Sequence, residues 1–142
     1  MQFWERNKSI TTFYESCTKS VREHFDLTQM QFDILMFLHN NPQFHTAAEI
    51  VKLRRLTKSQ VSAALRDLEE RGLISTTHTQ QNRKSRHIAL MDPAREICVA
   101  GLRAQEAFGQ QLLQGFSQDE MELCRTLFLR MVQNAEIGLE QM

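Results

Sequence analysis

The sequence predicts a mainly α-helical protein that carries one small β-hairpin. Capping signals for helices recur along the chain, and residues 73–79 are rich in β-branched side chains. The 142 residues correspond to one domain of ordinary size, and a hydrophobic content of 42% is enough to form a core. Gly and Pro number only 5 and 2, which excludes collagen-like and low-complexity chains.

Helix starts are marked by capping boxes, in which a Ser or Thr is followed three residues later by Gln or Glu. The pairs are Thr28–Gln31, Thr46–Glu49, Thr57–Gln60 and Ser117–Glu120, and Asp92–Pro93 has the form of another helix start. We therefore expect helices from about residues 28, 46, 57, 92 and 117. A first helix without a clear cap is expected around an apolar stripe from Ile10 to Val21.

The expected hairpin follows the fourth helix, which Gly72 should end in a left-handed conformation. Residues 73–79 and 86–90 have the composition of strands, and the polar, basic residues 80–85 are expected to connect them. The charge pattern singles out the same part of the chain. The stretch from Thr46 to His87 holds nine basic and four acidic side chains, a net charge of +5 in a chain that is neutral overall. This basic segment predicts a polyanionic partner, and the alternative is a solvated, salt-bridged surface.

The helices that begin at Thr46 and Thr57 start only 11 residues apart, with Arg54–Leu56 as the connection. This is the spacing of a helix–turn–helix, and a basic hairpin directly after it indicates a winged helix–turn–helix. In that arrangement the second helix enters the DNA major groove and the hairpin reaches the adjacent minor groove. The alternative is an ordinary surface helix in an all-helical domain.

Helical spacing divides the second of these helices into an inward stripe of Val61, Ala64, Leu65 and Leu68 and an outward face. We expect Arg66, Ser59 and Gln60 to read bases, and Lys58, Arg54 and Arg55 to contact phosphates. Arg83 at the hairpin tip is expected to enter the minor groove. The full set of expected DNA-binding residues is Arg54, Arg55, Thr57, Lys58, Ser59, Gln60, Ser62, Ala63, Arg66, Arg83, Lys84 and Arg86.

These motifs, in this order, resemble the MarR family of bacterial regulators. The matching stretches are 27–31, 56–62, 68–74 and the wing residues 82–85, and the flanking helices also fit. The resemblance implies one domain over 1–142, with a winged helix–turn–helix at about 28–91 and helical dimerisation parts at 1–24 and 92–142. It also implies a homodimer with intertwined terminal helices that binds a pseudo-palindromic operator in double-stranded DNA, usually as a repressor, and that often responds to a small ligand.

The sequence departs from the family pattern in three places. Asn82 stands where the family's wing usually has Asp, Arg54–Leu56 replaces a Leu-Gly-Leu turn, and Leu90–Met91 replaces Leu-Thr. These differences put an Asp–Arg pairing in the wing in doubt and predict that the operator and the pose of the wing differ from those of the best-known members.

Other functional classes find little support in the sequence. The chain has no Gly-rich phosphate loop, no HExxH and no GxSxG motif, so we expect no enzyme and no cofactor. The five His residues are scattered, which argues against a metal site. No run of residues is apolar enough to cross a membrane and no signal peptide is recognised, so a cytoplasmic protein is expected.

Two alternatives to a ligand-responsive DNA-binding repressor remain open, and so does the identity of the effector. Cys98 and Cys124 are expected to pack in cores, whereas Cys17 lies one turn after Tyr14 and is the candidate redox residue of a redox-sensing regulator. A plain packing role for Cys17 is favoured over sensing. A winged-helix protein-interaction module without DNA binding is the second alternative. The expected effector is a small apolar or aromatic molecule, bound between the first, second and fifth helices.

Overall fold

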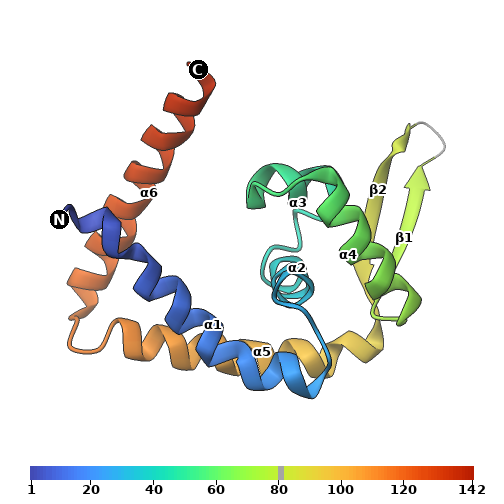
Figure 1. The fold of residues 1–142 in the computed structure, drawn as a ribbon, viewed down its shortest axis with the longest axis horizontal. Helices are drawn as coiled ribbons and strands as arrows, with labels where there is room; N and C mark the ends of the chain where they lie inside the picture. The colour runs from blue at the N-terminus through green and yellow to red at the C-terminus, as the bar shows by residue number, and fades with distance from the viewer. Residues whose placement is uncertain (80–81) are drawn as a thin grey trace. The chain divides into compact units, whose positions relative to one another are not determined.

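The computed structural model describes the backbone of residues 1–79 and 82–142, and the side chains of residues 1–78 and 86–142. It contains seven helices and two strands in these residues (Figure 1). In chain order they are η1 (Phe3–Arg6), α1 (Asn7–His24), α2 (Gln29–Asn40), α3 (Ala47–Arg54), α4 (Lys58–Glu70), β1 (Ile74–Thr79), β2 (Asn82–Leu90), α5 (Asp92–Leu112) and α6 (Gln118–Glu140).

The prediction of a mainly helical chain with one hairpin is confirmed, and the expected capping boxes form. At the start of α2, the Thr28 hydroxyl accepts from the Gln31 amide at 3.1 Å, and the Gln31 side chain accepts from the Thr28 amide at 3.0 Å. The boxes at Thr46, Thr57 and Ser117 have the same reciprocal form. Gly72 takes a φ of 73°, which ends α4 in the left-handed conformation that glycine adopts without steric cost.

The hairpin is longer than the sequence suggested. Strands β1 and β2 pair antiparallel from Ile74 opposite Leu90 to Thr79 opposite Asn82, with an irregularity between His78 and Thr79. The prediction that 82–85 belong to the connector is therefore wrong, because their backbone lies in β2. A two-stranded ribbon does not need an apolar face near its tip, so polar and basic residues there can still be paired. Residues 80–81 lie outside the described part of the chain.

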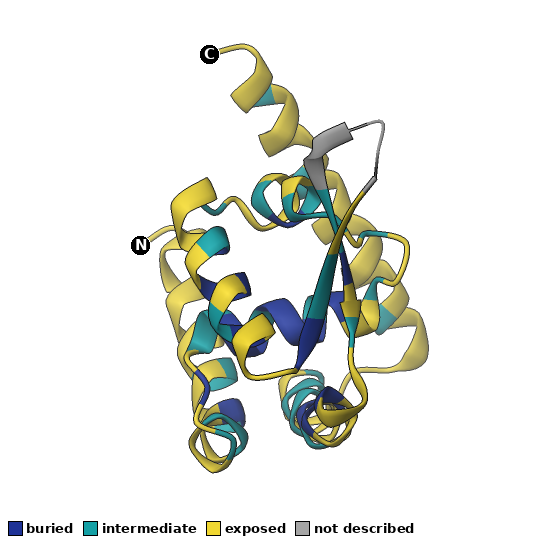
Figure 2. Ribbon diagram, turned by 90° about the vertical axis from the view of Figure 1, so that its right-hand side faces the viewer, coloured by how far each residue is buried: buried dark blue, intermediate teal, exposed yellow. Residues whose placement is uncertain are grey.

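The hydrophobic core surrounds α2, as its nearly continuous apolar sequence predicts. Figure 2 shows buried residues in the interior of the helical array and exposed residues on its outer surfaces. Phe32 and Leu35 on α2 are fully buried, and α4 contributes Leu65 and Leu68. The strands add Ile74 and Ile88, so the hairpin is packed against the same core as the helices that precede it.

A glycine allows the close approach of α5 to α2. A Cβ atom at Gly101 would lie 2.5 Å from the Met36 sulfur and about 3.0 Å from the Phe32 ring, which is too short for a real contact. A side chain at position 101 would therefore force these two core residues to move. This packing keeps α5 against the central helix that supports the helix–turn–helix.

The chain forms two compact units, Met1–Phe108 and Gly109–Met142. The boundary between them falls inside α5, and the expected division into a DNA-binding part and dimerisation parts stays a prediction. Helix α6 has no buried residue. The prediction that Cys124 packs in a core is wrong for this chain, because Cys124 lies on α6 and is exposed.

Candidate nucleic-acid interface

Helices α3 and α4 form the predicted helix–turn–helix, and their short connection depends on a left-handed residue. Arg55 has a φ of 54°, which is uncommon for a side chain other than glycine. This conformation reverses the chain after α3, and the Leu56 amide then donates to the Val51 carbonyl at 3.1 Å. Thr57 follows as the N-cap of α4, and its hydroxyl accepts from the Gln60 amide at 3.2 Å. Helix α4 thus begins at Lys58, three residues after Arg55.

The two faces of α4 are oriented as helical spacing predicts. Val61, Ala64, Leu65 and Leu68 are all buried, and the outward residues Ser59, Gln60, Ala63 and Arg66 are all exposed. Ser62 lies between the two faces and is half-buried. Figure 1 shows α4 running beside the hairpin, and α4 is in contact with β1. The exposed residues near the start of α4 are small or polar, which permits close approach to a groove.

The side chain of Gln60 has a second role that the outward face alone does not reveal. Its Oε1 accepts from the Thr57 amide at 3.2 Å and from the Thr57 hydroxyl at 3.0 Å. The Gln60 carbonyl oxygen is therefore occupied by the helix cap, and its amide NH₂ remains for a base. Base reading by Gln60 stays a prediction, and in this conformation its side chain could only donate a hydrogen bond to a base.

The hairpin is attached to the helix–turn–helix by both backbone and side-chain bonds. The Ile88 amide donates to the His45 carbonyl at 2.7 Å, next to a bridge between Thr46 and His87. From the other strand, the Thr76 hydroxyl donates to Glu69 at 2.8 Å, which ties β1 to α4. These bonds hold the wing in a defined place beside α3 and α4.

The cations of the predicted interface have different surroundings. Arg55, Lys58 and Arg66 are exposed, and Arg86 is half-buried on β2. Arg54 has an ion pair instead, with its Nη2 3.5 Å from Asp33 Oδ2 on α2. The side chains of Arg83 and Lys84 lie outside the described residues, although their backbone belongs to β2. Phosphate contact by Arg54 stays a prediction. To bind a phosphate, the Arg54 guanidinium would have to break its ion pair with Asp33 or bind Asp33 and the phosphate together.

A small polar pocket lies beneath the helix–turn–helix, between α1, α2, α3 and α5. It has a volume of about 160 Å³ and is lined by Tyr14, Asp33, Asn40, Asn41, Arg54 and Gln105, with Met36 and Phe37. Gln105 Nε2 donates to the Tyr14 hydroxyl at 2.9 Å, and Asn40 donates to Gln105 Oε1 at 3.0 Å. The pocket involves the first, second and fifth helices that the sequence predicted for an effector and also α3, but most of the lining side chains form hydrogen bonds.

Burial affects the acids of this pocket. It raises the pKa of Asp33 above its ordinary value of 3.8, and the hydrogen bond from Gln29 and the charge of Arg54 act in the opposite direction. Burial also raises the pKa of Tyr14, although the hydrogen bond from Gln105 opposes it. The Asp33 carboxylate thus depends on neighbouring donors, and a ligand that competes for them would change the Asp33–Arg54 pair.

The remaining candidate sites have little reactive chemistry. Cys17 is half-buried on α1, and the hydroxyl of its neighbour Tyr14 is already bonded to Gln105. Cys98 is buried in the core as predicted, and this burial raises the pKa of its thiol. Among the described residues, no group of three or more His, Cys, Asp or Glu side chains is placed to hold a metal ion. No helix in the same part of the chain is long and apolar enough to span a membrane.

Comparison with known proteins agrees with this geometry. Residues 25–85 match the model of the MarR family. An HTH-type transcriptional regulator, YdgJ of Bacillus subtilis (strain 168), is 23% identical over 128 residues, which cover 90% of this chain and 73% of YdgJ.

Two solved structures have the same fold. Staphylococcus aureus MepR in its DNA-binding conformation has a TM-score of 0.85 at 23% identity and covers 95% of this chain and 99% of its own. A MarR-family regulator from Listeria monocytogenes in complex with a 26mer DNA has a TM-score of 0.84 at 18% identity, over 94% of this chain and 89% of its own. Members of this family are regulators and not enzymes. The chain is therefore similar to the MarR family over residues 25–85, and its fold is that of the winged helix–turn–helix proteins in these structures.

Proposed function

We propose that this protein binds double-stranded DNA sequence-specifically as a homodimer and represses transcription from a pseudo-palindromic operator. The observation that carries the proposal is the outward face of α4, where Ser59, Ala63 and Arg66 are exposed on a helix held from behind by the core. The DNA-bound relative from Listeria has the same fold, which supports this use of the helix. In a two-fold dimer, the recognition helices would meet half-sites about 10 base pairs apart.

Base reading and phosphate contact are assigned to different residues of α4. Arg66 is the exposed cation on the outward face, and a guanidinium binds guanine through two parallel hydrogen bonds. Lys58 lies at the first position of α4, beside the capped end whose free amides and positive dipole favour a phosphate. Arg66 is therefore expected to set sequence preference, and Lys58 to add affinity for any sequence.

The test compares Arg66→Ala with Lys58→Ala on an operator duplex selected by the wild-type protein and on a duplex of random sequence. Arg66→Ala should cost about 1–3 kcal/mol on the operator and relax one base position. Lys58→Ala should weaken both duplexes alike and reduce the salt slope by about one unit. Arg103→Ala, an exposed arginine on α5, is the matched control and should leave both affinities unchanged.

The result that would contradict this assignment is an equal loss for Arg66→Ala on both duplexes. Wild-type protein with no preference for any sequence, even at low salt, would instead favour the protein-interaction alternative. Fluorescence anisotropy over a range of salt concentrations separates these outcomes.

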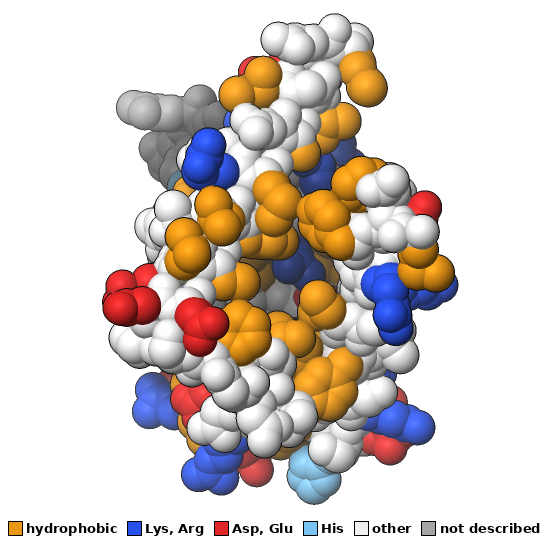
Figure 3. Space-filling model, turned by 90° about the vertical axis from the view of Figure 1, so that its left-hand side faces the viewer, with side chains coloured by type: hydrophobic (Ala, Val, Ile, Leu, Met, Phe, Trp, Pro, Cys, Tyr) orange, Lys and Arg blue, Asp and Glu red, His pale blue; other side chains and the backbone are white. Residues whose placement is uncertain are grey.

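Exposed apolar side chains support the homodimer. On α6, Leu127, Phe128 and Met131 are exposed to 44%, 59% and 48%, and near the N-terminus Phe3 and Trp4 are exposed to 71% and 58%. Figure 3 shows hydrophobic side chains open to solvent in the view that it draws. Side chains of this size are seldom left in water in such number, so a second copy of the chain is the proposed cover. The terminal helices of the two copies would pack against each other.

The polar pocket is the proposed place of effector binding. Its lining favours a small molecule that forms hydrogen bonds with Tyr14, Asn40 and Gln105, whereas the sequence led us to expect a small apolar or aromatic molecule. Arg54 connects the pocket to the helix–turn–helix, because it pairs with Asp33 and directly precedes the left-handed Arg55. Tyr14→Phe should weaken release of DNA by an inducer found in a metabolite screen, without changing DNA affinity in its absence. An unchanged inducer response would place the effector elsewhere.

A further inference from the structure

Arg71 joins the end of the recognition helix to a distant corner of the chain. It is the C-cap residue of α4, directly before the left-handed Gly72. Its Nη1 donates to the Asp26 carbonyl at 2.8 Å, and its Nη2 donates to the Phe25 carbonyl at 2.5 Å. One guanidinium therefore spans two successive backbone carbonyls that lie 45 and 46 residues away in the sequence.

The position of these two carbonyls gives the contact its chemical basis. They follow α1, whose chain leaves the helix through Asp26 at a φ of 52°. The last carbonyls of a helix lack partners within the helix and carry the negative end of its dipole, so they favour a cation. The last turn of α1 is closed by its own backbone, because the Asp26 and Leu27 amides donate to the Glu23 and Arg22 carbonyls at 3.3 and 2.8 Å. Arg71 adds a cation from α4 at the two carbonyls that follow this turn. The planar guanidinium fits two adjacent acceptors, which a lysine ammonium does not match in geometry.

A second contact holds α4 nearer its middle. The Gln31 side chain, in the first turn of α2, donates a short hydrogen bond from Nε2 to Asp67 Oδ2. Asp67 lies about 6 Å along the helix axis from Arg71 and about 12 Å from Ser59, given a rise of 1.5 Å per residue. A small displacement at Arg71 would therefore be doubled at the base-reading end if α4 pivoted about Asp67. The buried Leu65 and Leu68 and the hydrogen bond from Thr76 to Glu69 also hold this end of α4 in place.

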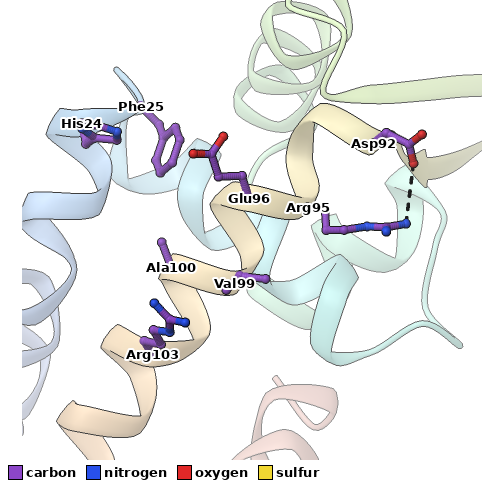
Figure 4. A pocket seen from close by; sticks show the side chains of 8 residues that line it. All are labelled: His24, Phe25, Asp92, Arg95, Glu96, Val99, Ala100 and Arg103. Atoms are coloured by element: carbon purple, nitrogen blue, oxygen red, sulfur yellow. Dashed lines mark ion pairs between the residues drawn. The ribbon is translucent and has the colours of Figure 1, made fainter.

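The corner that Arg71 holds is also in contact with α5. The Phe25 side chain packs against the core and, with Val99 and Ala100, lines a groove between the end of α1 and the first half of α5. Figure 4 shows its ring between the end of α1 and α5, near Glu96. Phe25 therefore shares this groove with α5 through its side chain and binds Arg71 of α4 through its carbonyl. The pair Phe25–Arg71 is a direct link between the helical scaffold and the recognition helix.

We propose that Arg71 is a positioning residue that fixes the angle of α4 on the scaffold and thereby sets the half-site spacing that the protein accepts. The proposal rests on the proposed function, because spacing has meaning only for a dimer on a two-part operator. Arg71 touches no DNA in this proposal. It acts through α4, whose two copies in a dimer must match the distance between half-sites.

The test measures affinity for duplexes in which the selected half-sites are kept and one base pair between them is added or removed. Wild-type protein should prefer its selected spacing. In Arg71→Gln, affinity for the selected spacing should fall about tenfold, the scale of a lost pair of charge-assisted hydrogen bonds, while the altered spacings change less. The salt slope should stay at the wild-type value, because no phosphate contact is removed. Arg71→Lys should restore part of the preference.

Glu70→Gln is the matched control, since Glu70 is the exposed neighbour of Arg71 on α4. It should keep the wild-type spacing profile. Arg71 is itself exposed, so both variants are expected to fold, and if Arg71→Gln does not fold, Arg71→Lys carries the test. Its spacing profile should lie between flat and wild-type.

Two results would overturn the proposal. One is an Arg71→Gln protein, or an Arg71→Lys protein where only that variant folds, with the wild-type spacing preference. The other is a fall of about one unit in the salt slope, which would make Arg71 a phosphate contact. Wild-type protein without any spacing preference would overturn the proposed function together with this inference. A wild-type preference that survives in the variant would overturn the inference alone.

Discussion

Helices α2 and α6 are both rich in apolar residues, yet they differ in how far these residues are buried. Six of the 12 residues of α2 are buried, and none of the 23 residues of α6 is. Helix α2 is surrounded by α4, the hairpin and α5, whereas α6 belongs to a separate compact unit and has an open apolar face. The winged module therefore obtains its stability from its own chain, and α6 has apolar surface available for another.

This difference separates two kinds of free energy. Burial of α2 contributes to folding of a single chain and does not depend on protein concentration. Burial of α6 against a second copy would contribute only where the dimer forms, and so would follow mass action. The same substitution, Phe to Ala, in the two helices should therefore have effects that differ in both size and concentration dependence.

The largest effect is expected for Phe32→Ala. The Phe32 ring is fully buried and contacts the site where Gly101 brings α5 close. Removal of a buried aromatic ring leaves a cavity and should lower the free energy of unfolding by about 3–5 kcal/mol. Urea unfolding followed by circular dichroism measures this loss, which should be the same in dilute and concentrated samples. A loss below about 1 kcal/mol would mean that the core around α2 is not packed as described.

A smaller and different effect is expected for Phe128→Ala on α6. Its side chain is 59% exposed in the single chain, so its removal should leave the winged module folded. If Phe128 packs against a second copy, the dimer should weaken by about 1–3 kcal/mol, which is roughly five- to 150-fold in Kd. Sedimentation equilibrium measures the Kd. Glu136→Gln, an exposed polar change on the same helix, is the control, and an unchanged Kd for Phe128→Ala would exclude this part of α6 from the interface.

Features with local causes were predictable from the sequence. The capping boxes depend on residues three apart, so Thr28–Gln31 and Thr57–Gln60 could be recognised without any tertiary information. The buried stripe of α4 was equally predictable, because helical periodicity alone decides which side chains share a face. The end of α4 at Gly72 followed from the special backbone freedom of glycine.

Features that depend on distant partners were not predictable in this way. No local pattern places Arg71 against Phe25 and Asp26, or pairs Arg54 with Asp33, because these contacts arise only when the helices assemble. The strand length of β2 was missed because polar residues at a ribbon tip fit a strand and a loop alike. Cys124 was misplaced because an apolar stripe shows that a face needs cover but does not show which chain provides it.

The cysteines provide the finest test of the same comparison, because each of the three reports on a different environment. Cys98 is buried, and its raised pKa leaves little thiolate at neutral pH, whereas Cys124 on α6 is exposed. Since the thiolate is the reactive form, iodoacetamide should label Cys124 quickly in dilute protein and Cys98 slowly, with the half-buried Cys17 between them. Labelling of Cys98 should accelerate as the pH rises toward its pKa.

Concentrated protein should protect Cys124 if α6 is covered by a second copy, and Phe128→Ala should remove that protection. Mass spectrometry of tryptic peptides gives the three rates. Protection of Cys124 that does not change on dilution would show that α6 is covered by its own chain. A separate experiment addresses Cys17: if peroxide releases the wild-type protein from DNA and Cys17→Ser abolishes this release, Cys17 is a redox sensor and its expected packing role is wrong.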